Sequence, residues 1–152
     1  MKTGTWRTIN DTVMGGKSSS ELVVTNQDLR FRGELSQQNN GGFSSARALV
    51  EEDLANSTGI RITVRGDGRD YQIRFRQDHN FDGTSWAYGF STDGSIQVIE
   101  APYPDFEPVF RGRKVTNAGS IEPAKIAQIG FLIADNIEGT FSLSILNMEV
   151  MR

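Results

Sequence analysis

The chain has 152 residues, of which 37% are hydrophobic and 23% are charged, and its formal net charge is −3 at pH 7. A chain of this length buries about 68–70% of its unfolded surface and needs no disulfide or structural metal to fold. The absence of cysteine excludes thiol catalysis and thiolate metal sites, and the acidic balance disfavours nucleic acid as a partner.

Apolar and polar residues alternate along most of the chain, which predicts strands with one buried face. The predicted strands lie, in chain order, near residues 6–9, 20–25, 28–36, 43–51, 59–66, 70–77, 86–91, 95–100, 108–111, 128–134 and 139–150. Only residues 123–127 predict a helical turn, with Pro123 at its first position. Many short strands with frequent turns indicate an all-β, antiparallel β-sandwich or barrel.

Gly66-Asp67-Gly68-Arg69 predicts a hairpin that joins residues 59–65 to residues 70–77. Paired in this way, the two strands would gather four arginines into one cationic patch: Arg61, Arg65, Arg74 and Arg76. The patch has two interpretations. It is either a solvent-facing polar surface interspersed with acids, or a concave face that binds carboxylates and hydroxyls through the planar guanidinium donors.

Two further features of the strands favour structural interpretations. In the last strand the apolar parity changes between Ile145 and Leu146, which predicts a β-bulge or burial of both faces. Trp86, Tyr88 and Phe90 share one parity, and we expect their rings to lie in the core, because large aromatic side chains dominate buried area.

Motifs for catalysis and metal binding are incomplete. His79 is the only histidine, it lies in a polar loop, and no Gly-x-Ser-x-Gly sequence accompanies it. Asp78, Asn80 and Asp82 begin like a calcium loop, but Gly89 stands where that loop needs a glutamate. We therefore predict neither a cofactor nor a metal site. No run of about 20 apolar residues predicts a membrane-spanning helix.

Two polar, glycine-containing clusters stand near the start of the chain, at residues 6–18 and 39–47. Each places a Gly-Gly step beside Asn or Asp and a large apolar residue. The glycines and amides either serve loop geometry or form the rim of a binding site. The candidate binding residues in and around the clusters are Asn10, Asp11, Gly15, Gly16, Ser18, Asn39, Asn40, Gly41, Gly42 and Arg47. Further candidates along the chain are Arg65, Asp67, Arg74 and Arg111.

These clusters, together with residues 31–36, 64–74, 102–113, 126–131 and 139–143, resemble the complex I intermediate-associated protein 30 family in order and spacing. The resemblance implies a single galactose-binding-like jelly-roll β-sandwich over residues 1–152. Mitochondrial members help to assemble respiratory complex I and are regarded as chaperone-like. This sequence lacks their transit peptide and long N-terminal extension, so the resemblance suggests a cytoplasmic bacterial relative.

The sequence therefore favours a non-enzymatic binding module whose partner is a protein or, by resemblance, a respiratory-complex assembly intermediate. A carbohydrate-binding module that holds a glycan on a concave sheet face is the alternative. A hydrolase that uses the acidic loops is a third, less favoured hypothesis. An exposed aromatic platform would indicate the glycan, and an exposed apolar patch would indicate the protein partner.

Overall fold

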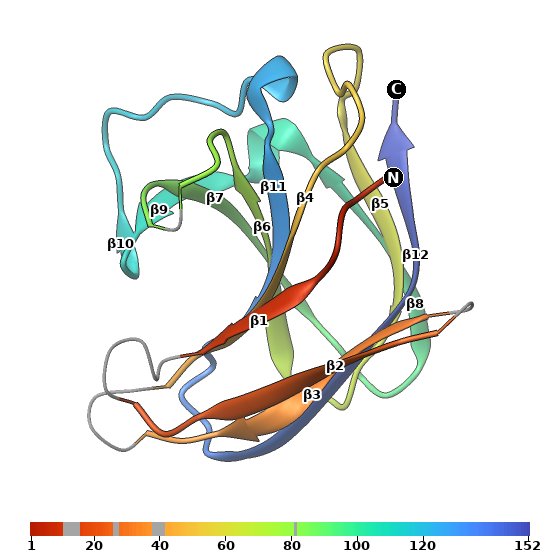
Figure 1. Cartoon of the computed structure of the whole chain (residues 1–152), viewed down its shortest axis with the longest axis vertical. Helices are drawn as coiled ribbons and strands as arrows, with labels where there is room; N and C mark the ends of the chain where they lie inside the picture. Colours follow the sequence, from red (N-terminus) through yellow and green to blue (C-terminus); the bar gives the residue numbers. More distant parts are fainter. Residues whose placement is uncertain (11–15, 26–27, 38–41, 81) are drawn as a thin grey trace.

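The computed structural model describes residues 1–10, 16–25, 28–37, 42–80 and 82–152, and within them the chain forms two stacked antiparallel sheets (Figure 1). The seven-stranded sheet has the order β1 (Arg7–Asn10), β4 (Ser44–Leu49), β11 (Gln128–Ile133), β6 (Asp70–Arg76), β7 (Ser85–Ser91), β9 (Glu107–Phe110) and β10 (Arg113–Lys114). The five-stranded sheet has the order β2 (Ser19–Val24), β3 (Leu29–Leu35), β12 (Gly139–Met151), β5 (Gly59–Arg65) and β8 (Ile96–Pro102). The predicted all-β antiparallel sandwich is confirmed.

The core lies between the two sheets and is built by the alternation seen in the sequence. Ile60, Ile62 and Val64 of β5 point inward and are fully buried, while the residues between them point outward. On the opposite sheet, Ile73 and Phe75 of β6 face them and are equally buried. Burying such side chains contributes roughly 1.5–3 kcal/mol each, so this alternation determines which face of each strand packs inward.

The expected positions of the aromatic rings and of the bulge are confirmed. Trp86 and Phe90 of β7 are buried, and Tyr88 packs against the same core. In β12, Ile145 pairs with Val64 of β5 and Asn147 pairs with the preceding Thr63, so one extra residue lies between the two pairs. This bulge shifts the inward parity of β12 and keeps both halves of the strand packed on the core.

The predicted hairpin between residues 59–65 and 70–77 is wrong. β5 lies in the five-stranded sheet and β6 in the seven-stranded sheet, so the connection over residues 66–69 crosses from one sheet to the other. A Gly-Asp-Gly turn serves a hairpin and a sheet crossing equally well, and alternation shows which face is buried but not which strand is the neighbour. The patch expected from that hairpin is therefore divided between the two outer faces of the sandwich.

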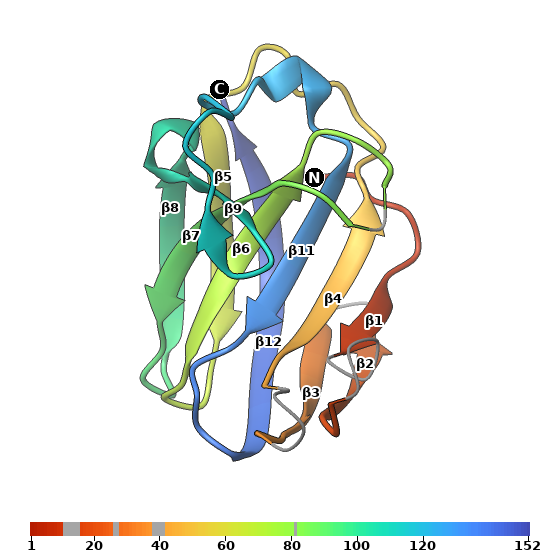
Figure 2. The same cartoon turned by 90° about the vertical axis from the view of Figure 1, so that its left-hand side faces the viewer.

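The remaining elements are short. The helical turn expected at 123–127 is present as the 3₁₀ turn η4 (Pro123–Lys125). A second 3₁₀ turn, η3 (Tyr103–Asp105), and the two-residue strand β10 were not predicted. The seven-stranded sheet is bent so that its outer face is concave, and Figure 2 looks onto this face from β7 to β1. The concave face carries a row of arginine side chains.

Candidate binding face

Four arginines, from three strands, share the outer face of the seven-stranded sheet, which we call the arginine face. Arg7 of β1 pairs with Arg47 of β4. Arg47 pairs with Gly130 of β11, and Gly130 pairs with Arg74 of β6. Directly paired residues point to the same side of a sheet, so these arginines form a row across it. Arg76, two residues further along β6, joins the row from the same side.

The guanidinium groups of β6 are held by neutral acceptors. Arg74 donates from Nε to Gln72 Oε1 at 2.8 Å and from Nη1 to Ser85 Oγ at 2.9 Å. Arg76 donates from Nη1 to the carbonyl oxygen of Gly83 at 3.1 Å. Within the part of the chain that the structure describes, neither arginine has a carboxylate oxygen within 4.0 Å. Their charges are thus oriented but not neutralised by direct ion pairs.

Burial and mutual repulsion disfavour the charged forms of these arginines. Burial lowers the pKa of Arg74 to about 10, with a further contribution from Arg76. Burial, followed by the charges of Arg76, Arg7 and Arg74, lowers the pKa of Arg47 to about 10, while Asp82 opposes the shift. Burial also lowers the pKa of Arg76 against the attraction of Asp82 and Asp78. All remain protonated at neutral pH, so the face concentrates positive charge in a partly dry setting.

A small pocket of about 20 Å³ lies in the middle of the arginine face. Its lining includes Arg47, Arg74, Arg76, Gln128 and Gly130. Gly130 adds no side chain to this space. A Cβ at this position would also lie 2.8 Å from the carbonyl oxygen of Ala46, which is too close for a side chain without a shift of the backbone. A space of this size holds about one water-sized group, so it suits the tip of a polar side chain.

The arginine face carries no aromatic ring at the described, outward-pointing positions of its four central strands. These positions are Ser45, Arg47 and Leu49 on β4; Gln128, Gly130 and Leu132 on β11; Gln72, Arg74 and Arg76 on β6; and Ser85, Ala87, Gly89 and Ser91 on β7. The aromatic side chains of β7 have the opposite parity and are in or against the core. At these described strand positions, the guanidinium donors have no flat ring surface beside them.

The outer face of the five-stranded sheet, which we call the mixed-charge face, has the opposite character. Arg61 lies between Glu100 and Glu149, at nitrogen–oxygen distances of 2.9 and 3.3 Å. Arg32 pairs with Glu21 of the neighbouring strand at 2.7 Å. The hypothesis of a polar surface interspersed with acids thus describes the part of this face around Arg32 and Arg61, whereas Ile96 and Val98 of β8 are exposed apolar side chains that pair with Arg65 and Thr63.

The described residues of the two glycine-containing clusters make structural contacts. Asn10 accepts a hydrogen bond from Ser20 Oγ at 2.5 Å, which joins the end of β1 to β2. The buried Ser18 accepts one from the Ser36 backbone N–H at 2.9 Å, and Gly16 is buried beside it. Gly42 has a φ of 131°, a backbone conformation that favours glycine. The other cluster candidates lie outside the described residues: Asp11, Gly15, Asn39, Asn40 and Gly41.

The three candidates not yet placed lie apart from the arginine face pocket. Arg65 is exposed on the mixed-charge face and donates to the Gly94 carbonyl at 3.1 Å. Asp67 accepts hydrogen bonds from the Tyr71 hydroxyl at 2.9 Å and from the Ser142 N–H at 2.8 Å, so it braces the crossing between the sheets. Arg111 is exposed and pairs with Asp82 at 2.7 Å. Of the sequence-predicted candidates that the structure describes, only Arg47 and Arg74 line one pocket together.

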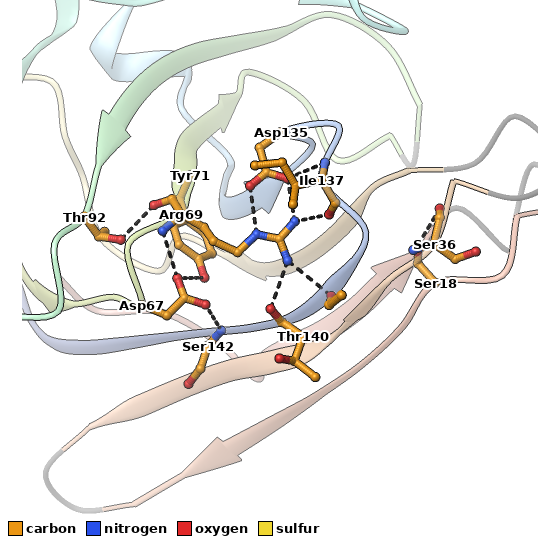
Figure 3. Close-up of polar contacts among 11 residues, drawn as sticks. Ser18, Ser36, Asp67, Arg69, Tyr71, Thr92, Asp135, Ile137, Thr140 and Ser142 are labelled. Atoms are coloured by element: carbon orange, nitrogen blue, oxygen red, sulfur yellow. Dashed lines mark hydrogen bonds and ion pairs between the residues drawn. The ribbon is translucent and has the colours of Figure 1, made fainter.

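Arg69 is the most fully bonded arginine that sequence reasoning did not single out (Figure 3). Its guanidinium donates to both oxygens of Asp135, at 2.8 and 2.6 Å, and to the Ile137 carbonyl. It also donates to the carbonyls of Gly139 at 3.2 Å and Thr140 at 2.9 Å. Arg69 lies on the β5–β6 crossing and Asp135 on the β11–β12 connection, so the pair joins two segments that pass between the sheets.

Other site chemistry is sparse. Among the described residues, no group of three His, Asp or Glu side chains is placed to hold a metal ion. His79 is exposed. No helix of the described chain has the length and apolar composition to span a bilayer. The arrangement of the arginine face is suited to holding an acidic group by charge-assisted hydrogen bonds.

The fold is that of carbohydrate-binding modules of the galactose-binding-like type. The family 11 module of a cellulosomal cellulase of Clostridium thermocellum superposes with a TM-score of 0.70 at 18% identity, covering 96% of this chain and 86% of that chain. The same family's module in complex with a beta-1,3-1,4-mixed-linked tetrasaccharide gives a TM-score of 0.69 at 20% identity, covering 96% and 88%. At this identity the likeness shows the fold alone.

The sequence matches the complex I intermediate-associated protein 30 family model over residues 1–145, and the chain belongs to this family. It is 26% identical over 163 residues to the mouse protein "Complex I intermediate-associated protein 30, mitochondrial", covering 92% of this chain. It is 27% identical over 148 residues to an uncharacterized protein of Schizosaccharomyces pombe, covering 84% of this chain and 68% of that protein. The chain spans 50% of the length of the mouse relative.

Proposed function

We propose that this chain is a non-catalytic binding domain that holds a protein partner on the arginine face, in the manner of an assembly factor. The observation that carries the proposal is the row of arginines, in which Arg74 and Arg76 are oriented by Gln72, Ser85 and Gly83 and have no direct carboxylate partner among the described residues. Charge left unbalanced in a partly buried site favours an incoming ligand of opposite sign. Family membership supports a protein partner, because the mouse relative is named for its association with a complex I intermediate.

A carbohydrate-binding module is the second candidate, and the fold favours it. A structurally similar module is known in complex with a mixed-linked tetrasaccharide. The outward positions of β4, β6, β7 and β11 do not supply the ring surface that a sugar would be expected to stack on. We therefore favour a protein partner over a neutral glycan as the ligand of this face.

The test uses the whole chain in two assays. Isothermal titration calorimetry against the mixed-linked tetrasaccharide and a panel of neutral soluble glycans should give no saturable heat. Affinity capture from native lysate of the source cells should retain a defined protein on the wild type and on Arg32→Gln, and lose it on Arg74→Gln. Saturable binding of one neutral glycan, abolished in Arg74→Gln, would contradict the protein-binding proposal and support the carbohydrate module.

A further inference from the structure

On its β6 side, the pocket in the arginine face has hydrogen-bond donors that no described residue uses. Arg74 uses Nε and Nη1, and Arg76 uses Nη1, for contacts within the described chain. Each guanidinium carries five N–H donors, so each keeps an Nη2 group with two N–H bonds for the pocket that both residues line. Gly130, which lies between Arg47 and Arg74, adds no side chain to this space.

A carboxylate fits this pocket better than other acceptors. Its two oxygens match the fork of guanidinium N–H groups, and charge-assisted bonds of this kind are about twice as strong as neutral ones. The volume of about 20 Å³ holds about one water-sized group, so it admits one carboxylate oxygen and no larger group without rearrangement. Burial, followed by repulsion among the arginines, lowers the pKa of Arg47 and Arg74, and a carboxylate in the pocket would offset the repulsion.

The neighbouring row of the same face contains the half-buried apolar side chain of Leu132, which defines what should lie next to the carboxylate. Leu132 lies two residues along β11 from Gly130, and it pairs with Ser45, which pairs in turn with Ile9 of β1. Ile9 is buried and Leu132 half-buried, although both point outward from the core. Residues two apart on a strand are about 6.6–6.8 Å apart, and so are alternate residues of an extended peptide.

We infer that the pocket receives the carboxylate of an Asp or Glu in an extended segment of a partner protein, with an apolar residue two positions away that packs over Leu132. This inference rests on the proposed function and specifies the ligand of the same face. The recognised pattern is acidic-x-apolar, read along the direction of β11. The fixed donors select the acidic residue, and the contact with Leu132 distinguishes a peptide from a uniformly hydrophilic acidic polymer.

The experiment is selection from a random twelve-residue peptide library on the wild-type chain and three variants. Arg74→Gln and Arg76→Gln each remove one guanidinium group from the β6 side of the pocket. Arg32→Gln is the matched control, because it removes one arginine charge from the mixed-charge face. Circular dichroism and thermal midpoints establish that each variant is folded.

We expect the wild type and Arg32→Gln to enrich acidic-x-apolar peptides, and Arg74→Gln and Arg76→Gln to lose that enrichment. By fluorescence anisotropy, the best peptide should bind at least about ten-fold more weakly to Arg74→Gln, and a Glu→Gln or Asp→Asn version of it should lose about as much on the wild type. Polygalacturonate, which carries carboxylates on sugar rings, should bind at least about ten-fold more weakly than the peptide.

The outcomes separate the two proposals. Enrichment of peptides without acidic residues would overturn the carboxylate assignment and leave the protein-binding function standing. Unchanged enrichment on Arg74→Gln, or polygalacturonate binding as tight as the peptide, would also overturn the inference. Failure to select any peptide would count against it, and joined with saturable binding of a neutral glycan it would overturn the proposed function as well.

Discussion

The two outer faces of the sandwich carry arginines at outward strand positions, yet they differ in what lies across the strands from them. On the mixed-charge face, Arg61 has Glu100 on one side and Glu149 on the other. On the arginine face, the neighbours of Arg47 across the strands are Arg7 and Gly130. Outward alternation alone therefore does not show whether an outward-pointing arginine lies beside an acid; the cross-strand partners do.

Arg74 and Arg76 are partly buried, and among the described residues neither guanidinium has a carboxylate oxygen within 4.0 Å. Like charges brought together and partly desolvated disfavour the folded state. On the mixed-charge face, by contrast, Arg32 and Arg61 are paired with acids. The proposed function accounts for this difference, because a ligand of opposite sign would offset the charges of Arg74 and Arg76.

Arg69 represents a third situation, in which an arginine is compensated completely inside the molecule. Its side chain is 11% exposed and that of Asp135 is 6% exposed, and the pair joins the two crossings between the sheets. Comparing Arg69 with Arg74 contrasts an arginine that is paired inside the molecule with one that we propose binds a ligand. Substitutions at these positions test this contrast, and we expect the largest loss of stability from substitution of Arg69.

Replacing Arg69 with methionine should destabilise the fold more than replacing Arg32 or Arg74. It leaves the Asp135 carboxylate buried without its cation and removes donors from the carbonyls of Ile137, Gly139 and Thr140. Breaking a buried pair by removing one partner costs about 3–5 kcal/mol. Urea denaturation measures the loss, with Arg32→Met as the control. A loss below about 1 kcal/mol would show that the pair does not hold the crossings together.

Stability should fall on acidification below about pH 4, and Asp135 should contribute to the fall. Burial alone would raise the pKa of Asp135, but hydrogen bonds from Arg69 and the Ile137 N–H lower it overall. The unfolded chain then binds more protons than the folded chain in this range. Stability therefore rises with pH up to the pKa of Asp135 in the unfolded chain, near 4, and is lost as the pH falls through the lower pKa of Asp135 in the folded chain. In Asp135→Asn, the slope of the unfolding free energy between about pH 2 and 5 should be smaller. An unchanged slope would contradict the assignment.

Strand parity was sufficient to predict much of the fold. The alternation in β5 and β6 gives their buried faces, and the parity change at Ile145 gives the bulge. The position of Trp86 in the core also follows from the shared parity of the β7 aromatics. These features depend on local sequence, because burial of one strand face acts on each strand separately.

The arrangement of the sheets was not predictable from the same information. Whether the turn after Arg65 leads to a neighbouring strand or to the opposite sheet depends on contacts made elsewhere in the chain. The arginine face depends on β11 lying between β4 and β6, which places Gly130 between Arg47 and Arg74. Asp135 meets Arg69 from 66 residues away. Nothing in the spacing of these residues along the chain indicates that they meet.

Replacing Arg74 with glutamine should leave stability unchanged or raise it by up to about 1 kcal/mol, although it removes hydrogen bonds to Gln72 and Ser85. The reason is that the substitution removes a partly buried charge that its neighbours repel. Raising sodium chloride from about 0.05 to 0.5 M should stabilise the wild type more than the variant, because salt screens that repulsion. The thermal midpoint measures both effects. A clear fall in the midpoint would show that Arg74 serves the fold and not a ligand.

The smallest effect should come from Glu149→Gln on the mixed-charge face, with the opposite sign to Arg74→Gln. The pKa of Arg61 is raised first by its hydrogen bond with Glu100, which persists in the variant, and only then by the contact with Glu149. Both partners are exposed, so the loss should lower the thermal midpoint by less than about 2 °C, and added salt should diminish it. Glu149→Gln makes the net charge of −3 less negative and Arg74→Gln makes it more negative, on faces built by the same alternation. A contrary result would be a higher thermal midpoint for Glu149→Gln at low salt together with a lower one for Arg74→Gln. Net charge rather than cross-strand partners would then explain both changes in stability, and the contrast between the two faces would not hold.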